Sequence, residues 1–97
     1  MRLEFHPSTA TDVREATVYY EQQRRGLGSH FLSELDKAIA QIARAPLAFP
    51  VVDGQVRRSI IKRFPYVVLY RVLEPDTLRV LAIRHHKRDP QIGIERR

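Results

Sequence analysis

Histidine and arginine side chains in the second half of the chain are suited to RNA cleavage without a metal. Attack of a 2′-hydroxyl on the neighbouring phosphate needs a general base, cations that stabilise the developing charge, and an acid for the leaving oxygen. His85 is the candidate acid or base, because an imidazole titrates near neutral pH. Arg63, Arg71 and Arg84 are the candidates for stabilising the phosphate charge. Together these residues would make the chain an endoribonuclease.

The same basic segment is also suited to binding acidic groups on a partner. Because alternate residues of a strand face opposite sides, Arg57 and Arg63 are expected to share one face. Arg58 and Lys62 are then expected to share the other face. One of these pairs would join arginines of the following strands in an exposed patch, which suits carboxylates and phosphates equally. The candidate binding residues are Arg57, Arg58, Arg63, Arg84, His85 and Arg88.

The four histidines do not form a metal-binding pattern. They show no consistent spacing of three or four residues from acidic residues, and the absence of cysteine excludes thiolate zinc sites and cysteine nucleophiles. His6, His30 and His86 are expected to be surface residues. The alternative role for His85 is structural, as a strand-end side chain that hydrogen-bonds a backbone carbonyl. We expect no metal and no cofactor.

The net charge of +6 is concentrated in the second half of the chain. Residues 1–54 contain six basic and seven acidic residues, whereas residues 55–97 contain eleven basic and four acidic ones. A basic half of this kind is typical of a surface that meets a polyanion or an acidic protein. The alternative is a basic surface that serves only solubility.

Length and composition indicate one small globular domain over residues 1–97. A chain of 97 residues has no room for two independent cores, and an apolar fraction of 43% lies in the globular range. The longest apolar runs are only a few residues, which excludes a transmembrane helix, and no apolar segment typical of a secretory signal follows the start. We therefore expect a cytoplasmic protein without membrane contact.

The first half of the chain predicts a strand and two helices. Residues 2–6 alternate like a short strand, and Ser8 and Thr9 can cap a first helix, with Thr9 and Asp12 resembling a capping box. Val13, Ala16 and Tyr20 mark its buried face. The glycines at positions 26 and 28 end it.

The second helix has the clearest pattern in the sequence. Ser29 is its predicted N-cap, and Pro46 stops it. Its buried face is predicted from apolar residues at helical spacing, namely Phe31, Leu35, Ala38, Ile39 and Ile42. The short connection between the two helices predicts an antiparallel hairpin.

The second half of the chain predicts a loop followed by three strands. Residues 45–54 are rich in proline and turn residues, and strands are predicted over 56–64, 66–73 and 78–85. The last two strands have apolar residues at both odd and even positions, so both of their faces are apolar. At least one of these strands is therefore expected to be central and covered on both sides. Phe64 and Tyr66 are expected to pack on the helical hairpin.

The order β-α-α-β-β-β predicts an α+β fold with two layers. A helical hairpin would pack on one face of a mainly antiparallel four-stranded sheet. The other face of the sheet and the ends of its strands would then be available to a partner.

Several short motifs together resemble the RelE/ParE superfamily of toxins from type II toxin–antitoxin modules, most closely its ParE branch. The resemblance covers nearly the whole chain. Its motifs are Tyr19-Tyr20, Gly26-Leu27-Gly28 before Phe31, Glu34-Leu35-Asp36-Lys37-Ala38-Ile39, Pro46…Phe49-Pro50, Val56-Arg57-Arg58, Lys62-Arg63-Phe64-Pro65-Tyr66, Tyr70-Arg71, Val80-Leu81-Ala82-Ile83 and His85-x-x-Arg88-Asp89-Pro90.

The sequence departs from the ParE pattern near its end. Ile92-Gly93-Ile94 stands where ParE-like sequences often carry a tryptophan, and the loss of that aromatic side chain is expected to loosen the C-terminus. His86 adds a second histidine beside the usual one at His85.

The resemblance implies a toxin that a co-expressed acidic antitoxin neutralises by folding around it. Members of the ParE branch resemble one another in inhibiting DNA gyrase, whereas the RelE branch cleaves mRNA on the ribosome. RelE-like nucleases frequently have a tyrosine near the C-terminus, and the last tyrosine here is Tyr70. We therefore expect a plasmid-stabilisation-type toxin that binds gyrase. The alternatives are a ribosome-dependent endoribonuclease and an inert toxin homologue.

Overall fold

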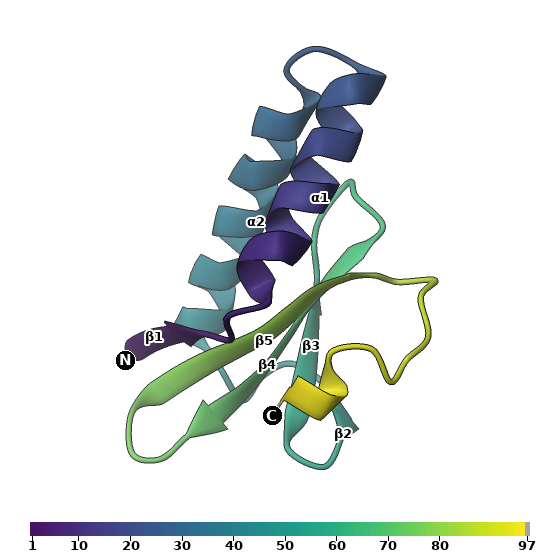
Figure 1. The fold of residues 1–97 in the computed structure, drawn as a ribbon. Helices are drawn as coiled ribbons and strands as arrows, with labels where there is room; N and C mark the ends of the chain where they lie inside the picture. The colour runs from purple at the N-terminus through teal and green to yellow at the C-terminus, as the bar shows by residue number, and fades with distance from the viewer. Residues whose placement is uncertain (97) are drawn as a thin grey trace.

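The computed structural model describes residues 1–96, which fold into two helices on a five-stranded sheet followed by a short 3-10 helix (Figure 1). The helical hairpin extends well past the end of the sheet. In chain order the elements are β1 (Arg2–Phe5), α1 (Thr9–Gln23), α2 (Leu27–Arg44), β2 (Val51–Asp53), β3 (Val56–Ile60), β4 (Tyr66–Leu73), β5 (Thr77–His85) and η1 (Ile94–Arg96).

The sheet has the order β1-β5-β4-β3-β2. β1 pairs with β5 in parallel, and the other three pairings are antiparallel, so the sheet is mixed. The α+β fold with a helical hairpin on one face is confirmed, but the predicted four strands are five. β2 lies inside the predicted loop at 45–54. Only three residues long and preceded by a proline, it is too short to show an alternating pattern.

The apolar stripe of α2 is buried as predicted. Phe31, Leu35, Ala38 and Ile42 are each at most 5% exposed, and Ile39 packs against the same core at its margin. On α1, Ala16 is buried, with Val13 and Tyr20 packed beside it. This core holds the hairpin on the sheet. None of the described helices is long and apolar enough to span a membrane.

The predicted helix N-caps are confirmed only in the position of Ser8. Ser8 occupies the N-cap position of α1 without a capping side-chain hydrogen bond, and the Thr9 hydroxyl donates to the His6 carbonyl at 2.7 Å. Asp12 is engaged in long-range contacts instead of a capping box. α2 begins two residues before Ser29, because Gly26 takes the N-cap position in a left-handed conformation, with φ +87°.

Strands β4 and β5 are central and covered on both faces, as predicted. Their helix-side residues join the hairpin core, which includes Phe64, whose ring centroid lies 5.2 Å from that of Phe31. Tyr66 also contacts Phe31, at 5.3 Å, so the expected packing of both aromatic residues is confirmed. A second cluster lies on the face that α1 and α2 leave uncovered, which we call the helix-free face, and consists of Val56, Val67, Leu69, Leu81, Ala82 and Ile94.

The C-terminal segment, residues 89–96, was expected to be loose. It is instead packed against this helix-free face. Ile94 is only 6% exposed and completes the second cluster. Gly93 has a φ of +93°, and a Cβ there would lie 2.6 Å from the Ala82 Cβ. Glycine therefore permits a close approach of the chain to β5.

Candidate functional site

Arg57 is used inside the fold. Its Nη1 donates hydrogen bonds to the carbonyls of Leu47 and Phe49, at 3.2 and 2.7 Å. These bonds tie β3 to the chain that leads into β2. Arg57 also partly offsets the effect of burial on Tyr70, whose pKa is raised to about 12. This arginine is therefore the candidate binding residue with the most evident structural role.

Three other arginines share the helix-free face of the sheet. Arg58 lies opposite Leu69, Arg84 lies opposite Val67, and Arg71 follows Leu69 by two positions on β4, so strand alternation puts all three on one side. Burial lowers the pKa of Arg84, and the charge of Arg58 lowers it further, whereas Asp89 opposes the shift. Arg58 and Arg84 are thus close enough for their charges to interact.

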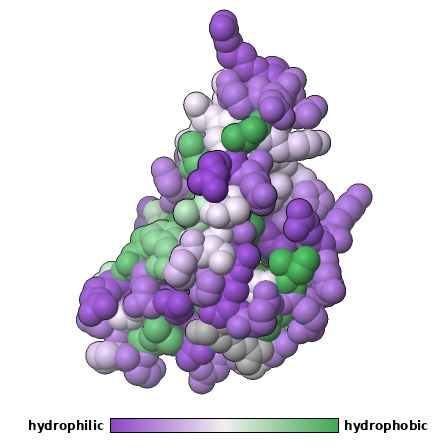
Figure 2. Space-filling view, in the orientation of Figure 1, coloured by the Kyte–Doolittle hydropathy of each residue, from purple (hydrophilic) through white to green (hydrophobic). Residues whose placement is uncertain are grey.

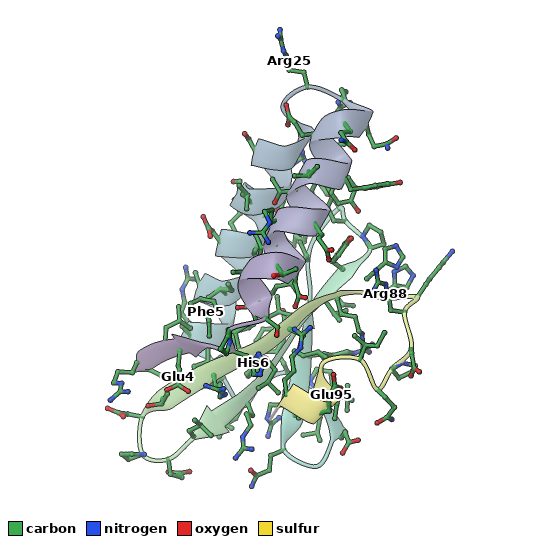
Figure 3. The ribbon with its side chains drawn as sticks, in the orientation of Figure 1. Glu4, Phe5, His6, Arg25, Arg88 and Glu95 are labelled. Carbon is green, nitrogen blue, oxygen red and sulfur yellow. The ribbon has the colours of Figure 1, made fainter. Side chains whose placement is uncertain are left out.

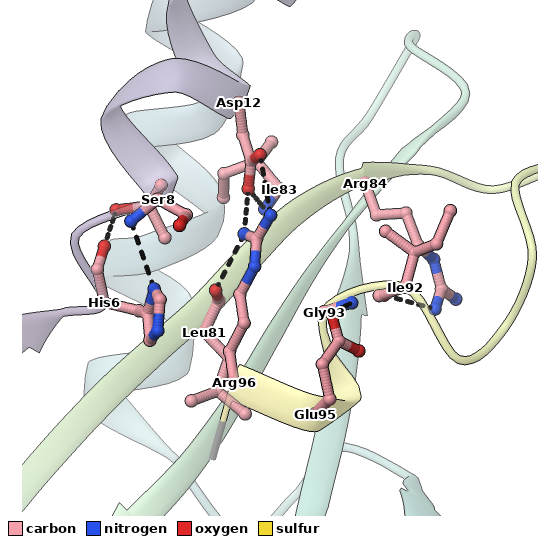
Figure 4. A network of polar contacts seen from close by, with 11 residues as sticks. His6, Ser8, Asp12, Leu81, Ile83, Arg84, Ile92, Gly93, Glu95 and Arg96 are labelled. Carbon is pink, nitrogen blue, oxygen red and sulfur yellow. Dashed lines mark hydrogen bonds and ion pairs between the residues drawn. The ribbon is translucent and has the colours of Figure 1, made fainter.

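Arg84 is partly engaged by the C-terminal segment. Its Nη1 donates to the carbonyls of Pro90 at 2.6 Å and Ile92 at 3.2 Å, as Figure 4 shows for Ile92. The Nε atoms of Arg71 and Arg84 are buried and have no hydrogen-bond partner among residues 1–96. Arg84 therefore holds the C-terminal segment through its Nη1, while its Nε donor remains unused.

Arg63 lies apart from these residues. It sits in the turn after β3 with a φ of +70° and lines a small cavity of about 190 Å³ beside Glu34 and Lys37 of α2. Strand β3 ends at Ile60 and does not reach residue 64 as predicted. The expected pairings of Arg57 with Arg63 and of Arg58 with Lys62 on its two faces are therefore wrong. The residues named for RNA cleavage are accordingly divided between the two sides of the sheet.

A polar cleft of about 580 Å³ brings three of the candidate binding residues together. It lies where α1, the end of β5 and the C-terminal segment meet, and we call it the α1–β5 cleft. The candidate residues that line it are Arg84, His85 and Arg88. Figure 3 labels Arg88 at the bend that follows β5. The other polar and aromatic residues of its wall are Ser8, Thr11, Asp12, Glu15, Tyr19, Tyr66 and Arg96.

An ion pair between Asp12 and Arg96 forms one side of the α1–β5 cleft (Figure 4). Arg96 Nη1 and Nη2 donate to the two carboxylate oxygens of Asp12 at 2.6 and 3.2 Å. Asp12 Oδ2 also accepts the Ile83 N–H at 3.0 Å, and Arg96 Nη1 donates to the Leu81 carbonyl at 3.1 Å. The hydrogen bond to Asp12 raises the pKa of Arg96. The pair joins α1, β5 and the C-terminal segment.

The ring of His85 contacts Tyr66 edge to face, with centroids 5.3 Å apart, and stacks on His86 at 5.0 Å. Its Nδ1 accepts the Lys87 N–H at 3.1 Å. Burial lowers the pKa of His85, and the positive charges of His86, Lys87 and Arg88 lower it further. Burial also raises the pKa of Tyr66, an effect that Arg88 partly opposes. His85 is thus held mainly in its neutral form at pH 7.

In an NMR titration, the His85 ring is expected to show a midpoint below its ordinary value of 6.5. The folded protein then binds fewer protons than the unfolded chain, so His85 contributes stability above that pH which is lost as the pH falls. Arg88→Ala should return part of the shift, because it removes one of the repelling charges. A midpoint at or above 6.5 in the unmodified protein would contradict this environment.

Sequence reasoning missed the part of the cleft that α1 and the C-terminus provide. Asp12 was assigned to a helix cap, and Glu15, Tyr19 and Arg96 were assigned no role in a site. Asp12 and Arg96 are 84 positions apart, and no local spacing signals their contact. Only the fold brings them together.

A separate apolar groove of about 530 Å³ lies where α1 meets β1. Phe5, Val13, Val18 and Leu32 are among its lining residues, and Phe5 and Val18 are nearly half exposed. Figure 2 shows apolar surface in this region, and Figure 3 labels Phe5 there. Exposed apolar surface of this kind is typical of a contact with another protein.

The architecture is that of a small toxin fold found in toxin–antitoxin systems. A solved structure entitled "Chromosomal ParDE TA system from P. aeruginosa" matches with a TM-score of 0.65 and 18% identity, over 88% of this chain and 95% of that one. The family model described as "ParE toxin of type II toxin-antitoxin system, parDE" matches residues 3–90. The chain therefore belongs to the ParE toxin family. A search of curated protein sequences gives no match.

Proposed function

We propose that this ParE-family toxin inhibits growth by binding DNA gyrase, and that an acidic antitoxin neutralises it. The observation that supports this most is the α1–β5 cleft, which combines Arg84, His85 and Arg88 in one surface hollow. The exposed Arg58 and Arg63 add positive charge outside the cleft. Such a surface recognises carboxylates of a protein partner by charge-assisted hydrogen bonds. The apolar groove beside β1 further favours a protein partner.

The first test is whether the purified protein blocks supercoiling by gyrase. We expect inhibition, and an Arg88→Ala variant should require about tenfold more protein for the same effect, because one charge-assisted hydrogen bond contributes about 1.5 kcal/mol. Arg88 is exposed, so its side chain can be removed without opening the core. Unchanged supercoiling with no trapped cleavage complex would exclude gyrase as the target.

Arg25→Ala is the matched control for this assay. Arg25 is exposed and lies at the tip of the helical hairpin, far from Arg88 (Figure 3). The variant removes the same charge and should inhibit gyrase like the unmodified protein. Equal loss in both variants would show that net charge alone carries the effect.

Neutralisation by the antitoxin is tested by expressing the proteins in cells. Expression of the chain alone should arrest growth, and co-expression of the acidic protein encoded in the neighbouring reading frame should restore it. Growth without arrest would indicate an inert homologue. Cleavage sites in mRNA on translating ribosomes, mapped by primer extension, would favour the endoribonuclease instead.

A further inference from the structure

Strand β5 continues beyond the strand that covers its edge. β1 pairs with residues 77–80 of β5, and His6 then donates its N–H to the Val80 carbonyl as the chain turns into α1. β5 runs on to His85. Residues 81–85 therefore have β4 on one side and no strand on the other, and this uncovered edge borders the α1–β5 cleft.

Side chains hydrogen-bond some of the backbone groups on this uncovered edge. Asp12 Oδ2 accepts the N–H of Ile83, and Arg96 Nη1 donates to the carbonyl of Leu81 (Figure 4). These two side chains make hydrogen bonds to the backbone of β5 that a neighbouring strand would otherwise make. Their geometry also shows which way the backbone of β5 faces at each residue.

Two backbone groups on the same edge remain unused. In an antiparallel ladder the N–H and C=O of one residue point to the same side, so the Ile83 carbonyl points away from β4 together with its N–H. His86 donates its N–H to the Pro65 carbonyl on the β4 side, at 2.8 Å, so His85 faces the open edge as Ile83 does. Among residues 1–96, the Ile83 carbonyl and the His85 N–H have no partner.

This pair of groups fits a parallel strand better than an antiparallel one. One residue of a parallel strand bonds the C=O before and the N–H after the residue opposite, which here is Arg84. An antiparallel neighbour would reach the same two groups from two different residues, and each of these would turn its other backbone group toward the Ile83 N–H or the His85 carbonyl. The Ile83 N–H is already held by Asp12, and the His85 carbonyl accepts the Arg88 N–H at 3.0 Å.

We propose that an extended segment of the antitoxin pairs in parallel with β5 at Arg84, continuing the line of β1 in the α1–β5 cleft. One residue of the segment donates to the Ile83 carbonyl and accepts from the His85 N–H, which is a short form of strand addition to a sheet edge. This inference rests on the proposed function, because it takes the antitoxin as the partner.

The charges around the cleft indicate the side chains of this segment. Arg88 and Lys87 are exposed at the end of β5, whereas Arg96 already neutralises Asp12 on the α1 side. Glu15 adds a negative charge on the α1 side. We therefore expect an Asp or Glu of the segment to face Arg88 and not α1.

The test compares His85→Pro with His85→Ala in binding to the purified antitoxin by titration calorimetry. Proline removes the N–H and is tolerated where that group points away from the sheet, whereas alanine removes only the ring and keeps the N–H. His85→Pro should bind about tenfold more weakly than His85→Ala, the effect of one lost hydrogen bond. Circular dichroism of both variants checks that they fold.

Hydrogen exchange on the unmodified protein gives a second readout that needs no variant. The His85 amide should exchange freely in the toxin alone and become protected in the complex. Equal affinities of the two variants, or an His85 amide that is not protected when the antitoxin is bound, would overturn strand addition but leave the proposed function intact. An antitoxin that does not bind the unmodified toxin would overturn both.

Discussion

Asp12→Ala is expected to lower the free energy of unfolding by about 3 kcal/mol. The change removes the two-point ion pair to Arg96 and leaves the Ile83 N–H without its acceptor. Both charged side chains are less than a fifth exposed, and breaking such a pair costs more than breaking a surface pair. For a domain of this size the melting temperature should fall by about 15 °C. Urea unfolding measures the effect directly.

Asp36→Ala is the matched control for this change. Asp36 is an exposed carboxylate on α2, so its removal alters the net charge equally and should change stability by less than about 0.5 kcal/mol. Asp12→Asn keeps one acceptor oxygen and should give an intermediate loss. If Asp12→Ala and Asp36→Ala unfold at the same urea concentration, the ion pair does not hold the C-terminal segment in solution.

Gly93→Ala is expected to detach the C-terminal segment and cost about 3 kcal/mol. Alanine at a φ of +93° is strained by about 1–2 kcal/mol. Its Cβ would also lie 2.6 Å from the Ala82 Cβ, a contact that is relieved only if the segment moves away from β5. Movement would expose Ile94 and weaken the contact of Arg96 with Asp12. Thermal unfolding and hydrogen exchange of residues 89–96 measure the result.

Gly26→Ala separates the two causes. Gly26 has a similar φ of +87°, but a Cβ there meets nothing within 4 Å, so the variant reports backbone strain alone. Its loss should be about 1 kcal/mol. Similar losses at both glycines would mean that the close approach of the segment to Ala82 contributes nothing.

The parts of the fold that could be predicted from the sequence are those with a local pattern. α2 was predicted because five apolar residues recur at helical spacing, and β4 was predicted with its observed bounds because its residues are apolar and β-branched on both faces. The resemblance to ParE toxins was also visible in the sequence, and the family match over residues 3–90 confirms it.

The helix caps and β2 could not be predicted in this way. The capping box at Thr9 and Asp12 is a local preference, but Asp12 gains more from Arg96 and the Ile83 N–H, which only the folded chain brings near. β2 exists because three residues after Pro50 can pair with β3 across a turn at Gly54. Its own residues carry no periodic signal.

By itself, the sequence determined the class of fold and the concentration of positive charge in the second half, because periodicity and composition need no knowledge of distant contacts. The family was indicated by the resemblance of its motifs to those of ParE toxins. Only the tertiary structure decided how that charge is used. It engages Arg57 and Arg84 with backbone carbonyls, separates Arg63 from the helix-free face, and unites Arg84, His85 and Arg88 in one cleft. The physical reason is that a guanidinium bonds whatever acceptors the fold brings within reach, and residues 84 positions apart can supply them.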